Sequence, residues 1–450
     1  MNGRCWLLLS LAATSLGCTE DTAVEEPPVD VAPVDVAPAT DPGPADPGKD
    51  TAAAATPPAP ECGDVWFADN AGFKRYPYLQ SITQTDGRIV WTTTTEAAGA
   101  VEIAASPDGP WTRFEANREL FDMARTLDII DYFAFDAAVE GLKAGHTVCY
   151  RLLQDDKVIA SGLHFTSAWT DPDRPLRILA FGDSGSGSDD QKGVRDAFMA
   201  HDFDIFLHMG DMAYGSGTFT EFEAHFFDIY KDLLHKAPTW PTMGNHEYKT
   251  NAGQPYLDVY YLPEQAQREE EQERYYSFDY GDVHMVSVET NDAPLIIAGL
   301  YELSGEPSML SWLRADLAAS DKPWKIAFFH HPPYSSSERD PNHVVRENVL
   351  PILEEGGVDL VLSGHDHHYE RTVPMWQGEA SAPGKKGLTY IVAGAGGAGL
   401  RDVFPQWWTD GIENKKFSFV SLTINKCELT GSAIAMDGTT VDTFALNGCE

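Results

Sequence analysis

The sequence contains little cysteine and little positive charge. Only 6 of the 450 residues are cysteines, and they are scattered along the chain. Metal sites with soft thiolate ligands need clustered cysteines, so the sequence excludes a site of that kind. Lys and Arg total 32 against 69 Asp and Glu, and the formal net charge of −37 argues against nucleic acid or an anionic membrane surface as a partner.

The N-terminus lacks a hydrophobic run long enough to span a membrane. A charged start, Met1-Asn2-Gly3-Arg4, precedes an apolar stretch of about eleven residues, which predicts an export signal over residues 1–17. The stretch ends in Ser15-Leu16-Gly17-Cys18, which is similar to a bacterial lipoprotein box. We expect Cys18 to carry a lipid anchor, with ordinary signal cleavage nearby as the alternative.

Large apolar residues are almost absent from the segment that follows. Residues 19–60 are rich in Ala, Pro, Asp and Glu, a composition that cannot bury a core. Residues 18–62 are therefore predicted to be the anchor cysteine and a disordered linker. The expected location is the bacterial cell envelope, at the outer membrane or cell surface, with membrane contact through the lipid anchor only. Secretion is the alternative.

Four more cysteines remain in the mature chain, and an even number in an exported protein predicts two disulfides. They are Cys62, Cys149, Cys427 and Cys449. Three pairings are possible. Proximity in sequence favours a bond between Cys427 and Cys449, which leaves Cys62 to pair with Cys149.

Residues 72–168 have the pattern of β-structure. Apolar and polar residues alternate in 88–93 and in 147–152, with turn residues between such runs, and this predicts an all-β sandwich. The roughly 390 residues beyond the linker exceed one ordinary core, so a larger α/β domain is expected to follow. We place the boundary within 171–175, which gives domains at 63–170 and 171–450.

Five short polar motifs lie beyond residue 180, and most follow an apolar run. In chain order they are Gly182-Asp183-Ser184-Gly185, Gly210-Asp211-Met212-Ala213-Tyr214, Gly244-Asn245-His246-Glu247, His330-His331-Pro332-Pro333 and Gly364-His365-Asp366-His367-His368-Tyr369-Glu370-Arg371. The apolar runs 178–181, 205–207, 326–329 and 358–362 predict buried strands. Loops at the carboxyl ends of such strands converge in α/β sheets, so the motifs predict one site.

The side chains in these motifs are carboxylates, imidazoles, an amide and a phenol, which suit iron, zinc or manganese. The series resembles the metallophosphoesterase, or calcineurin-like phosphoesterase, superfamily over roughly residues 176–400. Tyr214 stands three residues after Asp211, and Gly185 stands where ordinary members carry a histidine. Both features resemble the purple acid phosphatases, which implies a layered α/β metallophosphoesterase domain. The preceding region, with Pro77-Tyr78-Leu79-Gln80, is similar to the fibronectin type III-like domain of many such enzymes.

The resemblance implies a binuclear metal centre with two ligand sets. The first ion, Fe(III), would be held by Asp183, Asp211, Tyr214 and His367. The second ion, Zn, Mn or Fe(II), would be held by Asp211, Asn245, His330 and His365. Asp211 would then bridge the two ions, as a carboxylate with two oxygens can. His208 and His331 are expected to be structural.

The implied activity is hydrolysis of phosphomonoesters by metal-bound hydroxide, as in an acid phosphatase. His246 and His343 are the candidates for a proton donor to the leaving group. In so acidic a chain, the metals are expected to supply the positive charge that attracts phosphate.

Two other functions would also fit this domain organisation. A phosphodiesterase would use the same metals, and a catalytically idle adhesion or scaffold lipoprotein would keep the domains without the chemistry. The segment Gly394-Ala395-Gly396-Gly397-Ala398-Gly399 matches a dinucleotide-binding pattern, but the chain after it leaves no room for the ribose-binding half. Its glycines are instead expected to let backbone pass close to the metals. The sequence leaves the natural substrate, the second metal and the oligomeric state open.

Overall fold

The structure of the protein is a computed structural model that describes residues 62–339 and 341–448. The predicted signal, Cys18 and the linker up to residue 61 lie outside the described residues. Within the described ranges, no helix is long and apolar enough to cross a membrane.

The first described region is a sandwich of two antiparallel sheets, as the alternation in the sequence predicted. One sheet has the order β1 (Trp66–Phe67), β9 (Lys157–Thr166), β8 (Thr147–Gln154), β4 (Gly99–Ala104), β5 (Thr112–Glu115). The other has the order β2 (Phe73–Gln80), β3 (Asp86–Thr93), β7 (Tyr132–Glu140), β6 (Asn117–Phe121). The short helix α1 (Met123–Thr126) connects β6 to β7. Side chains of both sheets form one core, in which the rings of Trp91 and Phe135 stack with centroids 5.1 Å apart. The finer resemblance to fibronectin type III domains stays a prediction.

A disulfide joins Cys62 to Cys149 across 87 residues of sequence, so this part of the predicted pairing is confirmed. It fastens the start of the described chain to β8 of the sandwich. Closing a loop of this length stabilises a fold by about 4.5 kcal/mol in the chain-entropy description. Cys449 lies outside the described residues, and its pairing with Cys427 stays a prediction.

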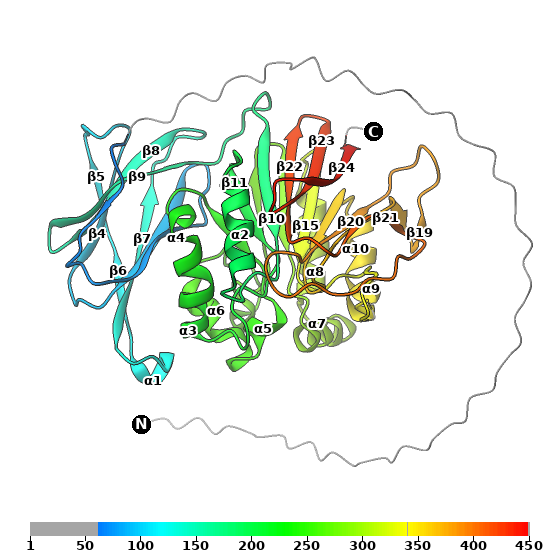
Figure 1. Ribbon diagram of the computed structural model, residues 1–450, viewed down its shortest axis with the longest axis horizontal. Coiled ribbons are helices and arrows are strands. Elements are labelled where there is room, and N and C mark those ends of the chain that lie inside the picture. The colour runs from blue at the N-terminus through cyan, green and yellow to red at the C-terminus, as the bar shows by residue number, and fades with distance from the viewer. Residues whose placement is uncertain (1–61, 340, 449–450) are drawn as a thin grey trace, which may run out of the picture. The chain divides into compact units, whose positions relative to one another are not determined.

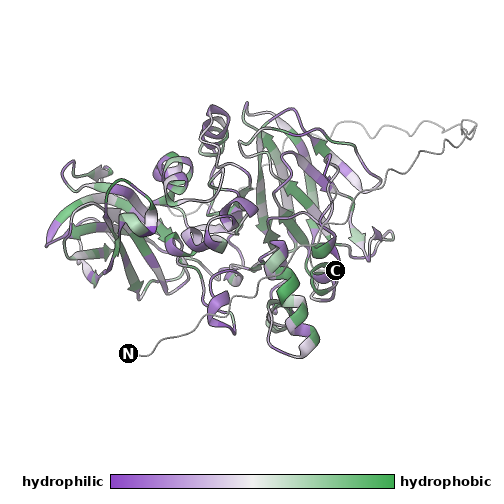
Figure 2. Ribbon diagram, turned by 90° about the horizontal axis from the view of Figure 1, so that it is seen from below, coloured by the Kyte–Doolittle hydropathy of each residue, from purple (hydrophilic) through white to green (hydrophobic). Residues whose placement is uncertain are grey.

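The larger region contains two facing sheets, whose central strands are almost entirely buried. The first sheet has the order β12 (Thr239–Pro241), β11 (Ile205–His208), β10 (Leu176–Phe181), β22 (Ser418–Asn425), β23 (Glu428–Ala435), β24 (Thr440–Asn447). The second has the order β13 (Tyr276–Tyr280), β14 (Val283–Ser287), β15 (Trp324–Phe329), β16 (Leu360–Ser363), β20 (Thr389–Ala393), β17 (Tyr369–Thr372), β21 (Thr409–Glu413). A small hairpin, β18 (Met375–Trp376) and β19 (Glu379–Ala380), lies apart from both. In Figure 2 the strands of these sheets are largely coloured as hydrophobic.

Helices cover the outer face of each sheet, as Figure 1 shows. Beside the first sheet lie α2 (Asp189–Phe198), α3 (Phe219–Phe222), a π-helix (Glu223–Phe227), α4 (Asp228–Leu234), α5 (Asn245–Tyr248) and α6 (Gln254–Val259). Beside the second lie α7 (Asp292–Ser304), α8 (Met309–Ala319), α9 (His343–Asn348) and α10 (Leu350–Glu355). One apolar cluster contains side chains of both sheets and of α2 and α4, and another packs α8 and α10 against β15. The predicted layered α/β sandwich is confirmed.

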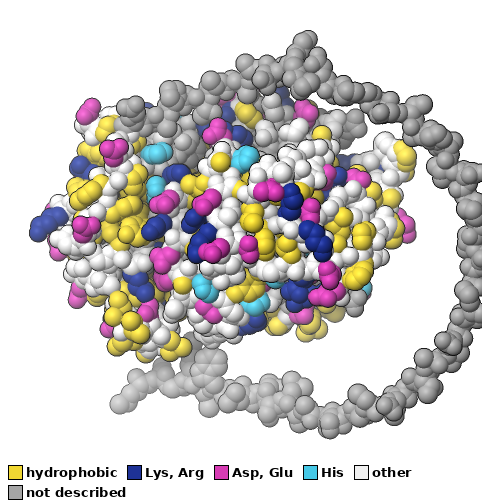
Figure 3. Space-filling model, viewed as in Figure 1, with side chains coloured by type: hydrophobic (Ala, Val, Ile, Leu, Met, Phe, Trp, Pro, Cys, Tyr) yellow, Lys and Arg dark blue, Asp and Glu magenta, His cyan; other side chains and the backbone are white. Residues whose placement is uncertain are grey.

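Buried polar contacts attach the β-sandwich to the larger region. Arg75 Nε donates to Glu223 Oε1 at 3.1 Å, and both side chains are almost fully buried. The hydroxyls of Tyr78 and Tyr150 donate to the carbonyls of Val259 and His235, each at 2.6 Å. On the face drawn in Figure 3, acidic and basic side chains are interspersed.

Candidate metal centre

The five motifs leave the sheets at neighbouring positions. Phe181 pairs with His208 across parallel strands β10 and β11, and His208 pairs with Pro241 of β12. The loops that carry Asp183, Asp211 and Asn245 therefore begin side by side. On the second sheet, Phe329 of β15 pairs with Ser363 of β16, so the loops that carry His330 and His365 also begin side by side. This is the convergence at the carboxyl ends of strands that the sequence predicted.

A first group of donors consists of Asp183, Tyr214 and His367. The Tyr214 hydroxyl lies 3.1 Å from Asp183 Oδ1 and 3.1 Å from His367 Nε2, and His367 Nε2 lies 3.5 Å from Asp183 Oδ1. His367 Nδ1 is 2.8 Å from the carbonyl of Gly399 and donates to it. The lone pair of His367 is therefore on Nε2, which faces the other two donors.

A second group of donors consists of Asn245, His330 and His365. Asn245 Oδ1 lies 3.0 Å from His330 Nε2 and 2.9 Å from His365 Nδ1, and the two imidazole nitrogens are 3.2 Å apart. His330 Nδ1 donates to the carbonyl of Met209 at 2.7 Å. That bond places the lone pair of His330 on Nε2, beside Asn245.

Asp211 lies between the two groups. Its Oδ1 is 3.5 Å from His330 Nε2 in the second group. Asp183, Asp211 and His330 offer ligand atoms that all lie within 4.8 Å of one another. The structure thus brings all seven sequence-predicted side chains together, and it divides them as the resemblance implied.

The backbone at these positions is unusual. Asp183 and Asp211 have φ of 58° and His365 has φ of 69°, a left-handed conformation that costs a non-glycine residue about 1–3 kcal/mol. Gly244 and Gly364, which precede Asn245 and His365, are needed for a different reason. A Cβ on Gly244 would lie 2.2 Å from Asp211 Oδ1, and one on Gly364 would lie 2.5 Å from Asp183 Oδ2. These glycines let one ligand loop approach the carboxylate of another.

Glu247 holds two ligand loops together, a role that the sequence did not reveal. Its fully buried carboxylate accepts hydrogen bonds from the backbone N–H groups of Asp211, Met212, Ala213 and Gly244, at 2.7, 2.8, 3.0 and 2.9 Å. The carboxylate therefore joins the loop that carries Asp211 to the loop that carries Asn245. Burial and the nearby charge of Asp211 raise the pKa of Glu247 to about 7.

Burial dominates the other pKa shifts in the site. It raises the pKa of the Tyr214 phenol well above 10, so the phenolate form needs a strongly positive neighbour such as a trivalent ion. Although burial opposes the change, contact with His367 and the hydrogen bond from the backbone N–H of His365 lower the pKa of Asp183. Burial and the positive charges of neighbouring groups, Arg339 and Arg401 among them, hold the pKa of His365 below its ordinary value.

The two predicted proton donors lie in different places. The ring of His246 packs edge-on to Tyr214 with centroids 4.2 Å apart, and His246 Nε2 lies 3.9 Å from Asp211 Oδ2. His246 Nδ1 donates to the carbonyl of Gly215 at 2.8 Å, which leaves Nε2 directed toward the site. His343 is exposed at the first turn of α9, and among the described residues no contact between it and the seven ligands is recorded.

His331 and Arg339 are close to the second group. His331, for which the sequence predicted a structural role, joins His330 and His365 in a set whose ligand atoms lie within 4.8 Å of one another. Arg339 Nη1 lies 3.0 Å from His365 Nε2. Arg339 belongs to none of the five motifs, so only the fold reveals it. His208 is neutral and buried beside Ser184, because burial lowers its pKa to about 3, in line with a structural role.

The glycine-rich segment 394–399 serves the site and opens no dinucleotide fold. A Cβ on Gly394 would lie 2.2 Å from the carbonyl oxygen of Asp366 and 2.9 Å from Asp183 Oδ2, so the glycine allows a close backbone approach. Gly399 accepts the hydrogen bond of His367. No helix follows β20 in the described part of the chain, so a dinucleotide-binding unit is excluded.

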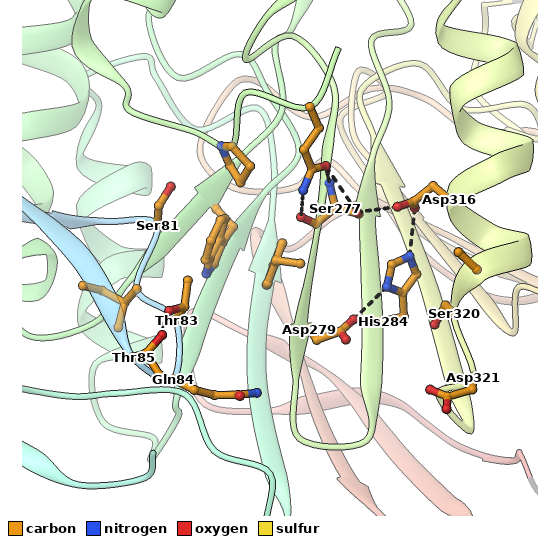
Figure 4. A pocket seen from close by; sticks show the side chains of 16 residues that line it. Ser81, Thr83, Gln84, Thr85, Ser277, Asp279, His284, Asp316, Ser320 and Asp321 are labelled. Carbon is orange, nitrogen blue, oxygen red and sulfur yellow. Dashed lines mark hydrogen bonds and ion pairs between the residues drawn. The ribbon is translucent and has the colours of Figure 1, made fainter. Parts of the chain in front are cut away.

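A separate cavity of about 540 Å³ contains another cluster of histidine and carboxylates (Figure 4). His284 Nδ1 donates to Asp279 Oδ1 at 2.8 Å, and His284 Nε2 donates to Asp316 Oδ2 at 2.9 Å. Although burial lowers it, these two hydrogen bonds raise the pKa of His284 to about 9. Both ring nitrogens carry a proton at neutral pH, so this histidine has no lone pair for a metal.

Comparisons with known proteins agree with the family resemblance of the motifs. Residues 176–369 match the calcineurin-like phosphoesterase family. Purple acid phosphatase 21 of Arabidopsis thaliana is 28% identical over 233 residues, which cover 50% of this chain and 50% of that protein. Probable inactive purple acid phosphatase 9 of Arabidopsis thaliana is 24% identical over 364 residues, 67% of this chain and 54% of that protein. The chain spans about half the length of the curated relatives that it matches.

A solved structure shows the same fold. A purple acid phosphatase from yellow lupin (Lupinus luteus) seeds superposes with a TM-score of 0.69 at 21% identity, and the match covers 83% of this chain and 74% of that one. Within the described residues, Asp183, Asp211 and His330 form a group that can bind metal. The chain therefore contains a segment that matches the calcineurin-like phosphoesterase family, and purple acid phosphatases are among its relatives.

Proposed function

We propose that the protein is an exported acid phosphatase that hydrolyses phosphomonoesters at a binuclear metal centre. One observation carries the proposal: the candidate ligands form two groups of donors, and Asp211 offers a ligand atom within 4.8 Å of Asp183 in the first group and of His330 in the second. A bridging carboxylate between two ions is the arrangement of two-metal hydrolases.

The donor set fits two different ions. We assign Asp183, Tyr214 and His367 to an Fe(III) ion, because a phenol and a carboxylate favour a trivalent metal. We assign Asn245, His330 and His365 to a divalent ion, since an amide and two imidazoles supply no negative charge of their own. The ring orientations support the assignment, because hydrogen bonds to the carbonyls of Met209 and Gly399 direct the lone pairs of His330 and His367 inward.

When bound, the two ions would activate water for attack on phosphorus and offset the charge that develops on the phosphoryl oxygens. The protein contributes position. His246 lies at the edge of the donor groups, with Nδ1 tied to the carbonyl of Gly215 and Nε2 directed inward. A proton on that Nε2 can pass to the leaving oxygen of the substrate. His343, exposed on α9, is a weaker candidate on this geometry.

Export is part of the proposal, and the disulfide supports it. A bond between Cys62 and Cys149 persists in oxidising compartments such as the bacterial envelope. The proposed anchor at Cys18 would hold the enzyme at the membrane through its lipid, with secretion as the alternative.

The test is metal content and hydrolysis measured on the same purified protein. We expect two metal ions per chain, one of them iron, a visible absorption band from the Tyr214 phenolate, and hydrolysis of p-nitrophenyl phosphate at acidic pH. Tyr214→Phe should remove the band from a folded protein. Two ions with no phosphatase activity would leave the metal centre but refute the proposed reaction.

An inactive scaffold is the second candidate, because one relative carries the name of a probable inactive phosphatase. Inactive relatives usually lose ligands, whereas all seven positions are filled and converge here. Tight metal binding without turnover on any phosphate ester would favour the scaffold.

A further inference from the structure

A guanidinium group reaches the candidate metal centre, although the chain as a whole is strongly acidic. Arg339 lies in the loop between β15 and α9, its side chain is exposed, and its Nη1 is 3.0 Å from Nε2 of His365. The positive charge at the site is therefore supplied by the protein as well as by metals, contrary to the expectation from the net charge of −37.

A second arginine is bonded through its backbone to the other histidine of the same motif. The backbone N–H of Arg401 donates to the carbonyl of His367 at 3.1 Å. Arg401 Nη1 is 4.0 Å from Glu338 Oε1, a long contact to a carboxylate that is 59% exposed. Within the described residues, the buried Nε of Arg401 has no hydrogen-bond partner. This cation is only weakly neutralised.

The loops that carry the two arginines are fixed to each other and to the ligand motif. Ser337 bridges to Val403, and the N–H of Phe404 donates to the carbonyl of Ser336 at 2.6 Å. The buried carboxylate of Glu370 accepts the N–H of Ser336 at 2.7 Å and its hydroxyl at 2.6 Å. The guanidinium groups thus extend from an ordered base, which lowers the entropy lost when they bind a ligand.

The contact between Arg339 and His365 is compatible with a free site but not with a metal on His365 Nδ1. That nitrogen faces Asn245 Oδ1 and is the atom directed at the second donor group. When Nδ1 is a ligand, the proton of the neutral imidazole is on Nε2. Nε2 can then no longer accept a hydrogen bond, and the Arg339 guanidinium becomes available for another acceptor.

We infer that Arg339 and Arg401 form an anion-binding rim that holds the substrate's phosphate oxygens and favours dianionic monoesters over monoanionic diesters. The inference rests on the proposed function. Guanidinium groups bind phosphate oxygens through pairs of charge-assisted hydrogen bonds. A second negative charge on the phosphate strengthens that attraction, whereas the second ester group of a diester removes one charge and one acceptor. The rim is a specificity determinant for the site.

The experiment compares Arg339→Ala, Arg339→Lys and Arg401→Lys with the wild-type protein. Arg113→Ala is the matched control, because this exposed arginine pairs with Glu115 and Asp156 of the sandwich and its loss changes the net charge equally. Two quantities are measured: the Kd for inorganic phosphate by calorimetry, and kcat/KM for p-nitrophenyl phosphate and for bis(p-nitrophenyl) phosphate. Thermal melting checks that each variant is folded.

For Arg339→Ala we expect phosphate to bind about tenfold more weakly and the preference for monoester over diester to fall by a similar factor. Arg339→Lys should lie between that variant and wild type, since a lysine keeps the charge but not the paired geometry. Arg401→Lys should shift both quantities in the same direction, and Arg113→Ala should shift neither.

The rim is refuted if folded Arg339→Ala and Arg401→Lys keep the phosphate affinity and the ester preference of the wild type. In that case, hydrolysis of the monoester by the wild-type protein would leave the proposed function standing. Wild-type protein that hydrolyses neither ester would refute the proposed function instead. The phosphate affinities of the variants would still decide for or against the rim.

Discussion

Two clusters in this protein combine histidine with aspartate, and only one of them is built to hold metal. In the candidate metal centre, His330 and His367 each donate one ring N–H to a backbone carbonyl, and their remaining nitrogens face other donors. In the cavity of Figure 4, both nitrogens of His284 donate to carboxylates, so the ring is a buried cation. Histidine and aspartate occur in both. The partner of each ring nitrogen decides whether the histidine is a ligand or one member of a charged triad.

Loss of the Asp211 carboxylate, which is proposed to bridge the ions, should produce the largest difference in metal content between the two clusters. In Asp211→Asn the amide offers a single oxygen and cannot bridge two ions, so we expect loss of at least one ion and a fall in kcat/KM of about a thousandfold. Elemental analysis and p-nitrophenyl phosphate hydrolysis measure the two effects. The matched variant Asp316→Asn makes the same chemical change beside His284 and should keep the metal content. A full metal complement in Asp211→Asn would refute the bridge.

Loss of the Glu247 carboxylate, which holds two ligand loops together, should have an intermediate effect on metal affinity. Glu247→Gln replaces an acceptor-only carboxylate with an amide whose NH₂ must face one of four backbone N–H groups. The loops that carry Asp211 and Asn245 should then separate, and metal affinity should fall about ten- to hundredfold. Competition with a chelator measures this loss. Asp359→Asn is the control, because it changes a buried carboxylate that lies before β16 and accepts the N–H of Lys325 at 2.9 Å. Equal metal affinity in Glu247→Gln and wild type would show that the carboxylate does not position the ligands.

The His284 triad should produce the smallest effect, and one that depends on pH. The folded pKa of about 9 lies above the unfolded value of 6.5. The triad therefore contributes stability that is fully present below pH 6.5 and is lost as the pH rises to 9. We expect about 2 kcal/mol at pH 6, since Asp279 is 44% exposed and solvent screens part of the interaction.

His284→Gln, which is neutral at every pH, provides the comparison for that effect. Denaturant unfolding of wild type and variant from pH 6 to 9.5 should give curves that converge as the pH rises. A stability difference that stays constant over this range would mean that His284 is not charged in the folded protein.

The sequence predicted the strands and the convergence of the candidate ligands, because both depend on local patterns. Apolar runs such as 178–181 and 326–329 became β10 and β15, and each motif was found at the end of a strand. The residues that the sequence missed depend on contacts between distant loops. Glu247 binds amides of a loop some 35 positions away, and Arg339 reaches His365 only because the fold joins their loops. Spacing along the chain suggested His343 as a proton donor near His330. Spacing does not show which side chain turns inward, and His343 is exposed on α9.

Anomalous diffraction from crystals of the metal-loaded protein, recorded at the iron edge and at a higher energy, tests the central claim most directly. We predict two metal peaks about 3.5–4 Å apart, an iron in contact with Tyr214 and His367 and a second metal in contact with Asn245 and His330, with Asp211 touching both. No peak should appear beside His284. A single peak, two peaks that do not share Asp211, or metal bound in the His284 cavity would contradict the account.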